Sequence, residues 1–200
     1  MPSLRTRPAA VDRLIVGLGN PGPEYVTTRH NAGYLVLGVL ARRHHFPKPS
    51  RAHVGRYAAG EMCGMQVGLL MPHTFMNDSG KSVAAALRAL RLLPAELLVV
   101  HDHIDLDFGR IRLSHDGGHG GHNGLRSLHE LVGKDFDRVR VGVDRPPSTD
   151  PEVVADYVLS PFAQPADDVR RLMEAAADAV EAWLRDGLEA AAARFNTGGP

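Results

Sequence analysis

LIVGLGNPGPEYVTTRHNAG, residues 14–33, begins with a short apolar run and continues into a loop dense in glycine and proline. The apolar run is typical of a buried strand, and the two prolines after position 20 stiffen the loop that follows it. Because loops at strand ends are where a rigid scaffold displays its functional groups, the segment predicts a preformed site. The polar and aromatic candidates that this loop carries are Asn20, Tyr25, His30 and Asn31.

The same segment contains the spacing G-x-G-x-x-G at residues 17–22, which is the fingerprint of dinucleotide-binding folds. That fingerprint needs a helix that begins inside the motif, so that its backbone N–H groups face a pyrophosphate. Pro21 and Pro23 lack such groups, and residues 35–49 contain no aspartate or glutamate to bind the ribose. The sequence therefore disfavours a dinucleotide site.

Length and composition indicate one globular domain. The 200 residues are 44% hydrophobic and 23% charged, which are ordinary values for a folded protein. We expect a disordered leader over residues 1–11, a domain over residues 12–195 and a frayed tail over residues 196–200.

With Cys63 as the only cysteine, no disulfide forms within the chain. Because neither a secretory signal nor a membrane-spanning run is visible, a cytoplasmic location is expected.

The net charge of zero conceals an asymmetry between two parts of the chain. Residues 1–145 hold 19 Lys and Arg against 13 Asp and Glu, so 19 − 13 = +6, and residues 146–200 hold 4 against 10, so 4 − 10 = −6. The basic part carries every motif that points to chemistry. It suits a polyanionic substrate, although a solvated surface of mixed charge has the same composition.

Short strand-like runs alternate with longer helical stretches along the chain. Strands are predicted at residues 13–17, 56–61, 65–71, 96–101, 110–113 and 138–143. Helices are predicted at residues 30–46, 77–92, 124–132, 151–159 and 166–194. This alternation predicts an α/β fold with a mixed twisted sheet flanked by helices and with a long C-terminal helix.

Polar residues follow the predicted strands at the points where ligands bind in such folds. Asn20 and His30 follow the first strand, Asn77 follows the hairpin, Asp102 follows the fourth strand, and Asn123 follows a glycine-rich loop. In open α/β sheets, ligands bind beyond the carboxyl ends of the strands. We therefore expect these loops to converge on one crevice.

An imidazole such as that of His30 serves as a general base near neutral pH, most effectively when a carboxylate fixes its tautomer. Asp102 is the best-placed carboxylate, although a histidine at a helix start also serves as a cap. The amide groups of Asn20, Asn77 and Asn123 can donate to a carbonyl oxygen or accept from a ribose hydroxyl, but asparagine is also an ordinary turn residue. Phe75 and Met76 either line the bottom of the cleft or belong to the core.

A metal-dependent alternative rests on the histidines. His101, His103 and Asp105 have the H-x-H-x-D spacing of binuclear zinc hydrolases, and His115, His119 and His122 border the glycine-rich loop. Leu106 stands where those enzymes continue with a histidine, and no further ligands are identifiable. Because a zinc site needs three or four ligands, the sequence predicts no metal.

Several ordered blocks together resemble the bacterial peptidyl-tRNA hydrolases over nearly the whole chain, from Leu14 to about Phe195. Several blocks at matching separations are far more specific than any single motif. The blocks are VGLGNPG at 16–22, RHNAG at 29–33, TFMN at 74–77, SGK at 79–81, HD at 101–102, GGHNG at 120–124 and RVRVG at 138–142.

The resemblance implies a monomeric α/β enzyme without metal or cofactor. Such an enzyme hydrolyses the ester between a peptide and the 3′ ribose of tRNA, which recycles tRNA from aborted translation. Carried onto this chain, His30 is the base that activates water and Asp102 keeps it basic, while Asn20 distinguishes N-blocked from free aminoacyl esters. The other residues implied to contact substrate, at the acceptor stem and 3′ end of peptidyl-tRNA, are Tyr25, Phe75, Met76, Asn77, Asn123 and Arg140.

Three positions depart from the family pattern. Ser114 stands where the family usually has a lysine that grips the tRNA 5′ phosphate together with the counterpart of Arg140. His103 replaces a usual glutamate, and Asp144 replaces a usual glycine. Arg112 lies two residues from Ser114, so on a strand it shares a face with that position and is predicted to take part in the grip. A diverged paralogue that acts on a special charged tRNA, or a non-enzymatic tRNA-binding module, are the alternatives.

Overall fold

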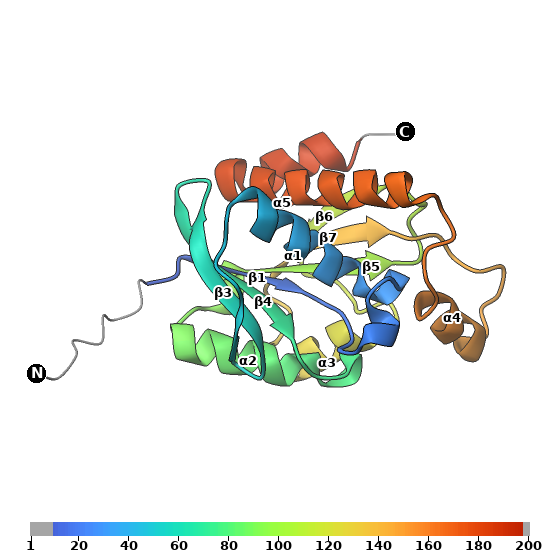
Figure 1. Cartoon of the computed structure of the whole chain (residues 1–200), viewed down its shortest axis with the longest axis horizontal. Helices are drawn as coiled ribbons and strands as arrows, with labels where there is room; N and C mark the ends of the chain where they lie inside the picture. Colours follow the sequence, from blue (N-terminus) through green and yellow to red (C-terminus); the bar gives the residue numbers. More distant parts are fainter. Residues whose placement is uncertain (1–9, 198–200) are drawn as a thin grey trace, which may run out of the picture.

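The computed structural model describes residues 10–197, which form a seven-stranded sheet between two layers of helices (Figure 1). The order of the strands across the sheet is β2-β3-β4-β1-β5-β7-β6. The strands are β1 (Arg13–Gly17), β2 (Ser50–Ala52), β3 (Gly55–Met62), β4 (Met65–Pro72), β5 (Leu97–His103), β6 (Ile111–His115) and β7 (Asp137–Gly142).

The centre of the sheet is parallel and its edges are antiparallel. Strand β1 pairs in parallel with β4 and β5, with Ile15 opposite Leu69 on one side and Leu98 on the other, and β5 pairs in parallel with β7. Strands β2, β3 and β6 pair antiparallel with their neighbours. The predicted mixed α/β sheet is confirmed, and the carboxyl ends of four parallel strands meet at one edge.

The helices cover both faces of the sheet, as Figure 1 shows, with α1 and α5 on one face and α2 and α3 on the other. The α-helices are α1 (Ala32–Arg43), α2 (Ser79–Leu90), α3 (Asn123–Val132), α4 (Pro151–Val158) and α5 (Ala166–Phe195). The 3₁₀ turns are η1 (Pro23–Tyr25), η2 (Arg29–Asn31), η3 (Met76–Asp78) and η4 (Pro94–Glu96).

Alternate residues of the central strands supply two apolar cores. Ile15 and Leu98 belong to the core under α1 and α5, whereas Val16 and Val99 belong to the core against α2 and α3. Because successive side chains of a strand point to opposite faces, strands buried on both sides read as continuous apolar runs. Those runs made the central strands predictable.

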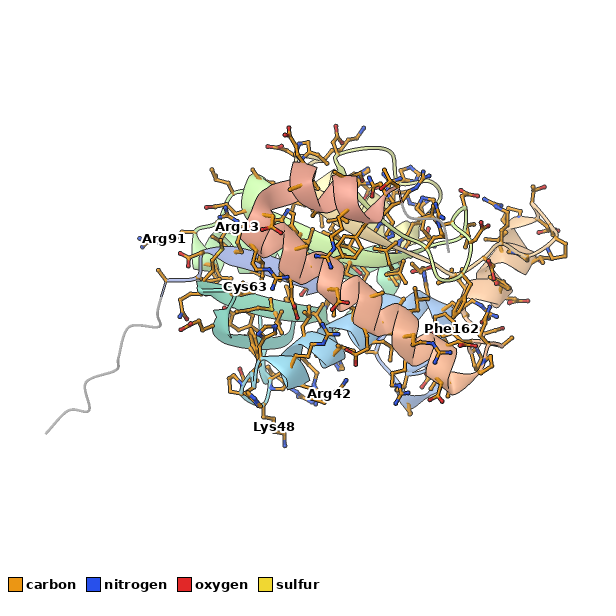
Figure 2. All side chains as sticks on the ribbon, turned by 90° about the horizontal axis from the view of Figure 1, so that it is seen from above. Arg13, Arg42, Lys48, Cys63, Arg91 and Phe162 are labelled. Carbon is orange, nitrogen blue, oxygen red and sulfur yellow. The ribbon has the colours of Figure 1, made fainter. Side chains whose placement is uncertain are left out.

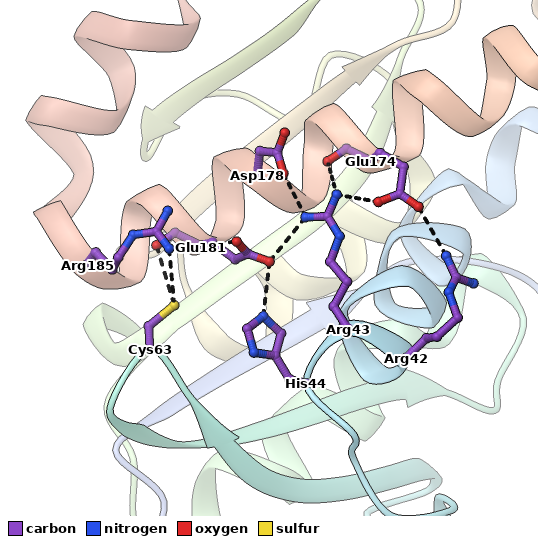
Figure 3. Close-up of polar contacts among 8 residues, drawn as sticks. All are labelled: Arg42, Arg43, His44, Cys63, Glu174, Asp178, Glu181 and Arg185. Atoms are coloured by element: carbon purple, nitrogen blue, oxygen red, sulfur yellow. Dashed lines mark hydrogen bonds and ion pairs between the residues drawn. The ribbon is translucent and has the colours of Figure 1, made fainter.

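Helix α5 lies across the sheet in Figure 2, and Gly187 (φ 81°, ψ 172°) bends it near its end. An ion-pair network joins α5 to the end of α1 (Figure 3). Arg43 binds Asp178 at 2.7 Å and Glu181 at 3.1 Å, and it also binds Glu174. His44 binds Glu181 at 3.0 Å. Since the three acids lie on one helical face, they act as a single docking surface for α1.

The structure differs from the predicted elements at several boundaries. The helices predicted from residues 30 and 77 begin as the 3₁₀ turns η2 and η3, so α1 and α2 start two residues later. Strand β5 extends to His103, and Asp102 therefore lies inside the strand near its end instead of following it. Strand β2 was not predicted because a three-residue edge strand shows no alternation of apolar and polar residues.

Most of the predicted leader and the end of the predicted tail lie outside the described residues. Of the leader, Val11 is buried, and of the tail, Asn196 exchanges hydrogen bonds of 2.8 and 2.9 Å with the backbone of Leu113. These contacts add one packed residue at each end to the predicted domain of residues 12–195. Over residues 10–197, no helix combines the length and hydropathy that crossing a membrane requires.

Candidate active site

A cleft of about 840 Å³ opens at the carboxyl edge of the parallel strands. The loops after β1 and β4, the end of β5 and the glycine-rich loop before α3 supply its lining, so the predicted convergence is confirmed. Of the ten residues predicted for the site, nine line this cleft and only Arg112 does not. The nine are Asn20, Tyr25, His30, Phe75, Met76, Asn77, Asp102, Asn123 and Arg140.

His30 and Asp102 form a buried pair at the floor of the cleft. Nδ1 of His30 lies 3.0 and 3.1 Å from the two carboxylate oxygens of Asp102, whose side chain is 2% exposed. A carboxylate accepts hydrogen bonds, so Nδ1 of His30 carries the proton and Nε2 keeps its lone pair. This is the tautomer that a general base needs.

A second imidazole, that of His122, shares the same carboxylate. Nε2 of His122 lies 3.0 Å from Oδ1 of Asp102, and the rings of His30 and His122 are 4.8 Å apart at their centroids. His122 is the N-cap of α3, and its Nδ1 accepts from the backbone N–H groups of Gly124 (3.1 Å) and Leu125 (3.4 Å). An accepting Nδ1 places the proton of neutral His122 on Nε2, which therefore donates to Asp102.

The pKa values follow from this arrangement. Burial opposes the charge of Asp102, but His30 and His122 outweigh burial, so the pKa of Asp102 lies well below its usual value and the group is ionised. Burial also opposes the protonated form of His30, and the charge and hydrogen bond of Asp102 outweigh it, so the pKa of His30 is raised. For His122 burial dominates and its pKa is lowered, which keeps this imidazole neutral.

Asn20, which also lines the cleft, is fixed by three hydrogen bonds. The side chain of Asn31 accepts from the backbone N–H of Asn20 at 2.9 Å and donates to its C=O at 3.0 Å. The side-chain oxygen of Asn20 accepts from the backbone N–H of Met76 at 2.8 Å. Because its oxygen is occupied, Asn20 has its Nδ2 amide left as the group that faces a ligand.

The side chain of Asn123 is held in a similar way, by its oxygen. Its side-chain oxygen accepts from Arg126 at 2.6 Å, which leaves the Nδ2 amide as a donor toward the cleft.

Asn77 is not the cap of α2, since Asp78 occupies that position. Phe75 is 63% exposed and so contributes cleft surface, whereas Met76 is buried in the core and touches the cleft as well.

Strands β6 and β7 present four residues on one face of the sheet, with Arg112 opposite Arg140 and Ser114 opposite Arg138. The shared face of Arg112 and Ser114 is therefore confirmed. Burial and the neighbouring Arg112 lower the pKa of Arg140, and no acid within residues 10–197 pairs with either guanidinium. The Oγ of Ser114 is buried without a hydrogen-bond partner among the described residues.

Arg138 fastens the glycine-rich loop to β7. This fully buried side chain donates to the carbonyls of Gly117 (2.7 Å) and Gly118 (2.9 Å) and lies 2.8 Å from Nε2 of His129. Burial, with the nearby Arg140, lowers the pKa of Arg138 to about 10. The loop that leads to His122 thus has a fixed path despite its glycines.

The structure accounts for two of the three departures from the family pattern. Asp144 has φ 62°, a value that favours glycine, and its carboxylate accepts from the N–H of Phe108 at 2.6 Å, which offsets the unfavourable backbone conformation. At His103, burial and the positive Arg140 both lower the pKa, so this residue is neutral where a glutamate would be charged. Arg140 therefore faces no carboxylate at this position.

The arrangement of side chains does not support the zinc alternative based on His101, His103 and Asp105. Nδ1 of His101 lies 2.6 Å from the carbonyl of Asp102, and the carboxylate of Asp105 is bound by Arg145 at 2.7 and 2.8 Å. Within the described residues, the group whose spacing suits a metal is instead His30, Asp102 and His122, with ligand atoms within 4.8 Å of one another. Metal binding there would need Nε2 of His122 without its proton, which conflicts with the accepting role of Nδ1.

Three contributors escaped the site prediction. His122 entered it only as a possible metal ligand, although its place beside Asn123 in the GGHNG block was a usable signal. Asn31 was noted in the first loop without a role, and its adjacency to His30 was the clue. Arg138 gave no signal, because its partners are backbone carbonyls.

The fold and the cleft define an α/β protein with the side-chain set of a hydrolase. A family model for peptidyl-tRNA hydrolase matches residues 14–199, and the chain belongs to the peptidyl-tRNA hydrolase family.

Named relatives and solved structures agree with this family. Peptidyl-tRNA hydrolase of Nocardia farcinica is 48% identical over 194 residues, covering 93% of this chain and 97% of the relative. That of Citrifermentans bemidjiense is 44% identical over 186 residues, covering 92% and 97%. The crystal structure of peptidyl-tRNA hydrolase from Acinetobacter baumannii has a TM-score of 0.83 at 36% identity, covering 96% of this chain and 97% of that chain.

Proposed function

We propose that this chain is a cytoplasmic, monomeric enzyme that hydrolyses the ester between a peptide, or an N-blocked amino acid, and the 3′ ribose of tRNA. Such a reaction recycles tRNA from aborted translation. The observation that carries the proposal is the buried His30–Asp102 pair on the floor of the cleft, with its Nδ1 to oxygen distance of 3.0 Å. Family membership supplies the substrate class.

In the proposed mechanism, His30 acts as the general base. Its Nε2 takes a proton from water, and the resulting hydroxide attacks the ester carbonyl. The bond between the carbonyl carbon and the ribose 3′ oxygen then breaks, and the imidazolium returns its proton to that oxygen. Asp102 holds the ring in the required tautomer and stabilises the imidazolium that forms. His122 acts through Asp102, because its hydrogen bond fixes the carboxylate oxygen that His30 also uses.

The two free amide groups are proposed to receive the developing negative charge. Asn20 and Asn123 both have their side-chain oxygens bound by protein donors, so their Nδ2 groups are preorganised as donors. Asn20 is also suited to contact the peptide carbonyl of an N-blocked substrate. Tyr25, Phe75 and Asn77 line the same cleft and are proposed to contact the 3′ end and the peptide.

Arg140 and Arg112 are proposed to grip the tRNA phosphate. The two guanidiniums lie on adjacent strands at the same register and have no acid partner within residues 10–197. Because residue 103 is a neutral histidine, it does not offset the charge of Arg140. These two features compensate for the uncharged Ser114, and a guanidinium can bind phosphate with two hydrogen bonds.

The proposal is tested by turnover on N-blocked and free aminoacyl-tRNA, each with and without a chelator. We expect hydrolysis of the N-blocked substrate in the presence of EDTA and little hydrolysis of the free aminoacyl ester. Activity that is lost with EDTA and restored by zinc would replace the proposal with a metal-dependent mechanism. Activity limited to one charged tRNA would favour the diverged paralogue, and binding without turnover would favour a tRNA-binding module.

A further inference from the structure

Helix α4 forms a wall of the cleft although little of it is buried. Val154 and Ala155, with Leu159 just after the helix, line the cleft, yet Val158 is its only buried residue. The helix stands apart from the two helical layers beyond the carboxyl ends of the parallel strands (Figure 1), and its main packing partner is η2. Since apolar burial does little to hold α4, polar contacts must fix it.

Arg29 supplies these polar contacts. Its side chain is buried, and Nη1 donates to the carbonyls of Tyr157 (3.2 Å), Ser160 (3.2 Å) and Pro161 (2.7 Å), all at or just beyond the end of α4. The backbone N–H of Arg29 also donates to Ser160 at 3.2 Å. The guanidinium carbon lies 4.0 Å from the centre of the Tyr157 ring, which adds a cation–π contact.

No acid within residues 10–197 pairs with Arg29, so the carbonyls at and just beyond the C-terminal end of α4 provide the compensating negative charge. The last carbonyls of a helix lack partners within the helix and carry partial negative charge, which favours a cation at this end. If α4 moved away from η2, a buried guanidinium would lose its acceptors. The contact is therefore a strong anchor for a weakly packed helix.

The anchor sits next to the proposed base. Arg29 and His30 are consecutive residues of the same 3₁₀ turn, η2, so one rigid turn carries both the grip on α4 and the imidazole. Arg29 does not line the cleft and does not reach the substrate directly. A second tie is the hydroxyl of Tyr157, which donates to the carbonyl of Val143 at 2.8 Å.

We propose that Arg29 is a positioning residue that fixes the α4 wall relative to His30 and so aligns the substrate ester with the base. This inference rests on the proposed function of the cleft. Without the anchor, α4 moves and the substrate binds less tightly and less well aligned. The His30–Asp102 pair itself stays intact, because neither residue is bound by the Arg29 side chain.

The test compares Arg29→Met with a matched control, Arg43→Met. Both remove an arginine that joins two elements, but Arg43 joins α1 to α5 away from the cleft (Figure 3). For Arg29→Met we expect faster hydrogen exchange at residues 151–159 and a KM for N-acetylaminoacyl-tRNA raised by roughly 10- to 100-fold. The pKa in the pH profile of kcat should not move. Arg29→Lys, which keeps a cation and fewer donors, should fall between these values and the wild type.

For Arg43→Met we expect a lower Tm with unchanged KM and unchanged exchange in α4. The inference is overturned if Arg29→Met keeps wild-type KM and α4 exchange, or if Arg43→Met raises KM equally. If Arg29→Met does not fold, the test passes to Arg29→Lys. Hydrogen exchange of α4 at the wild-type rate in Arg29→Lys then overturns the inference. A wild-type protein without hydrolase activity refutes the proposed function instead, while the exchange measurement still reports on the anchor.

Discussion

Asn31 holds Asn20 by both of its backbone polar groups, accepting from the N–H at 2.9 Å and donating to the C=O at 3.0 Å. The side-chain amide of Asn31 thereby pairs with the backbone of the loop as a neighbouring strand would. Because it follows His30 directly in the chain, the same turn that presents the proposed base also sets the position of Asn20. The positions of His30 and Asn20 are thus linked through one buried amide.

Replacement of Asn31 by alanine should therefore impair catalysis through Asn20. It removes both hydrogen bonds and leaves the backbone of Asn20 free to shift, so we expect kcat/KM to fall roughly 10- to 100-fold. Asn31→Asp keeps the acceptor but sets a buried carboxylate oxygen against the C=O of Asn20, so its loss should be at least as large. Steady-state kinetics on N-blocked aminoacyl-tRNA provide the measurement. Wild-type kinetics in Asn31→Ala would show that Asn20 does not need this support.

Substitution of the proposed base should abolish most turnover without loss of binding. His30→Ala removes the proton acceptor, and we expect kcat to fall by roughly 10²- to 10⁴-fold, the usual contribution of a positioned acid–base group. Affinity for tRNA and the melting temperature should change little. Wild-type turnover by His30→Ala would remove this residue from the mechanism.

The pH dependence should report the His30–Asp102 pair. His30 acts as a base only when neutral, so kcat/KM should rise with pH through its pKa, which Asp102 raises above 6.5. Asp102→Asn removes that charge and leaves burial, which lowers the pKa, so the acid limb should move to lower pH. The plateau should also fall by roughly 10²- to 10⁴-fold, since an amide does not hold the tautomer. An acid limb at the wild-type pH in Asp102→Asn contradicts this account.

The phosphate grip should appear in KM and in its salt dependence. Arg112→Ala and Arg140→Ala should each raise KM for full-length tRNA substrates and reduce the salt slope by roughly 0.7–0.9. Neither should affect a minimal ester without the tRNA body. Ser114→Lys adds a cation to the same face and should tighten binding. If all three variants leave KM unaltered, the grip is not used and a different tRNA preference gains support.

The network between α1 and α5 should make stability depend on pH. Burial by itself would raise the pKa of Glu181. Hydrogen bonds from His44 and Arg43 outweigh this effect, so the pKa of Glu181 is lowered. A lowered pKa contributes stability that is present above the unfolded value and is lost as pH falls through the folded value. Glu181→Gln should therefore cost about 1 kcal/mol near pH 7, or roughly 2–4 °C in Tm, and nearly nothing below the folded pKa. Thermal unfolding at several pH values measures this, and a pH-independent difference speaks against it.

The sequence predicted the central strands within one or two residues, because strands buried on both faces are continuous apolar runs. It also predicted the crevice, because parallel strands bring their carboxyl ends together and the polar residues follow those ends in the sequence. The edge strand β2 could not be found in this way, because three residues carry no period.

The rest of the site depends on contacts that no local pattern records. His122 meets Asp102 only after the glycine-rich loop folds back, and Arg138 directs that fold through carbonyl groups that every residue possesses. The same holds for Arg29, whose partners are carbonyls at and just beyond the end of α4, about 130 residues away in sequence. Side chains that bind backbone are visible in a sequence only as isolated polar residues.

The shared carboxylate of Asp102 has a consequence for the charge on the cleft floor. In the form that is ready to act as a base, with Asp102 ionised and both imidazoles neutral, the group formed with His30 and His122 carries one negative charge. In the proposed reaction, the proton that His30 takes from water cancels this charge, so the floor becomes neutral and never holds a net buried cation. The negative charge reappears on the substrate, nearer to Asn20 and Asn123. Each turnover thus displaces one unit of charge from the buried floor toward the open side of the cleft.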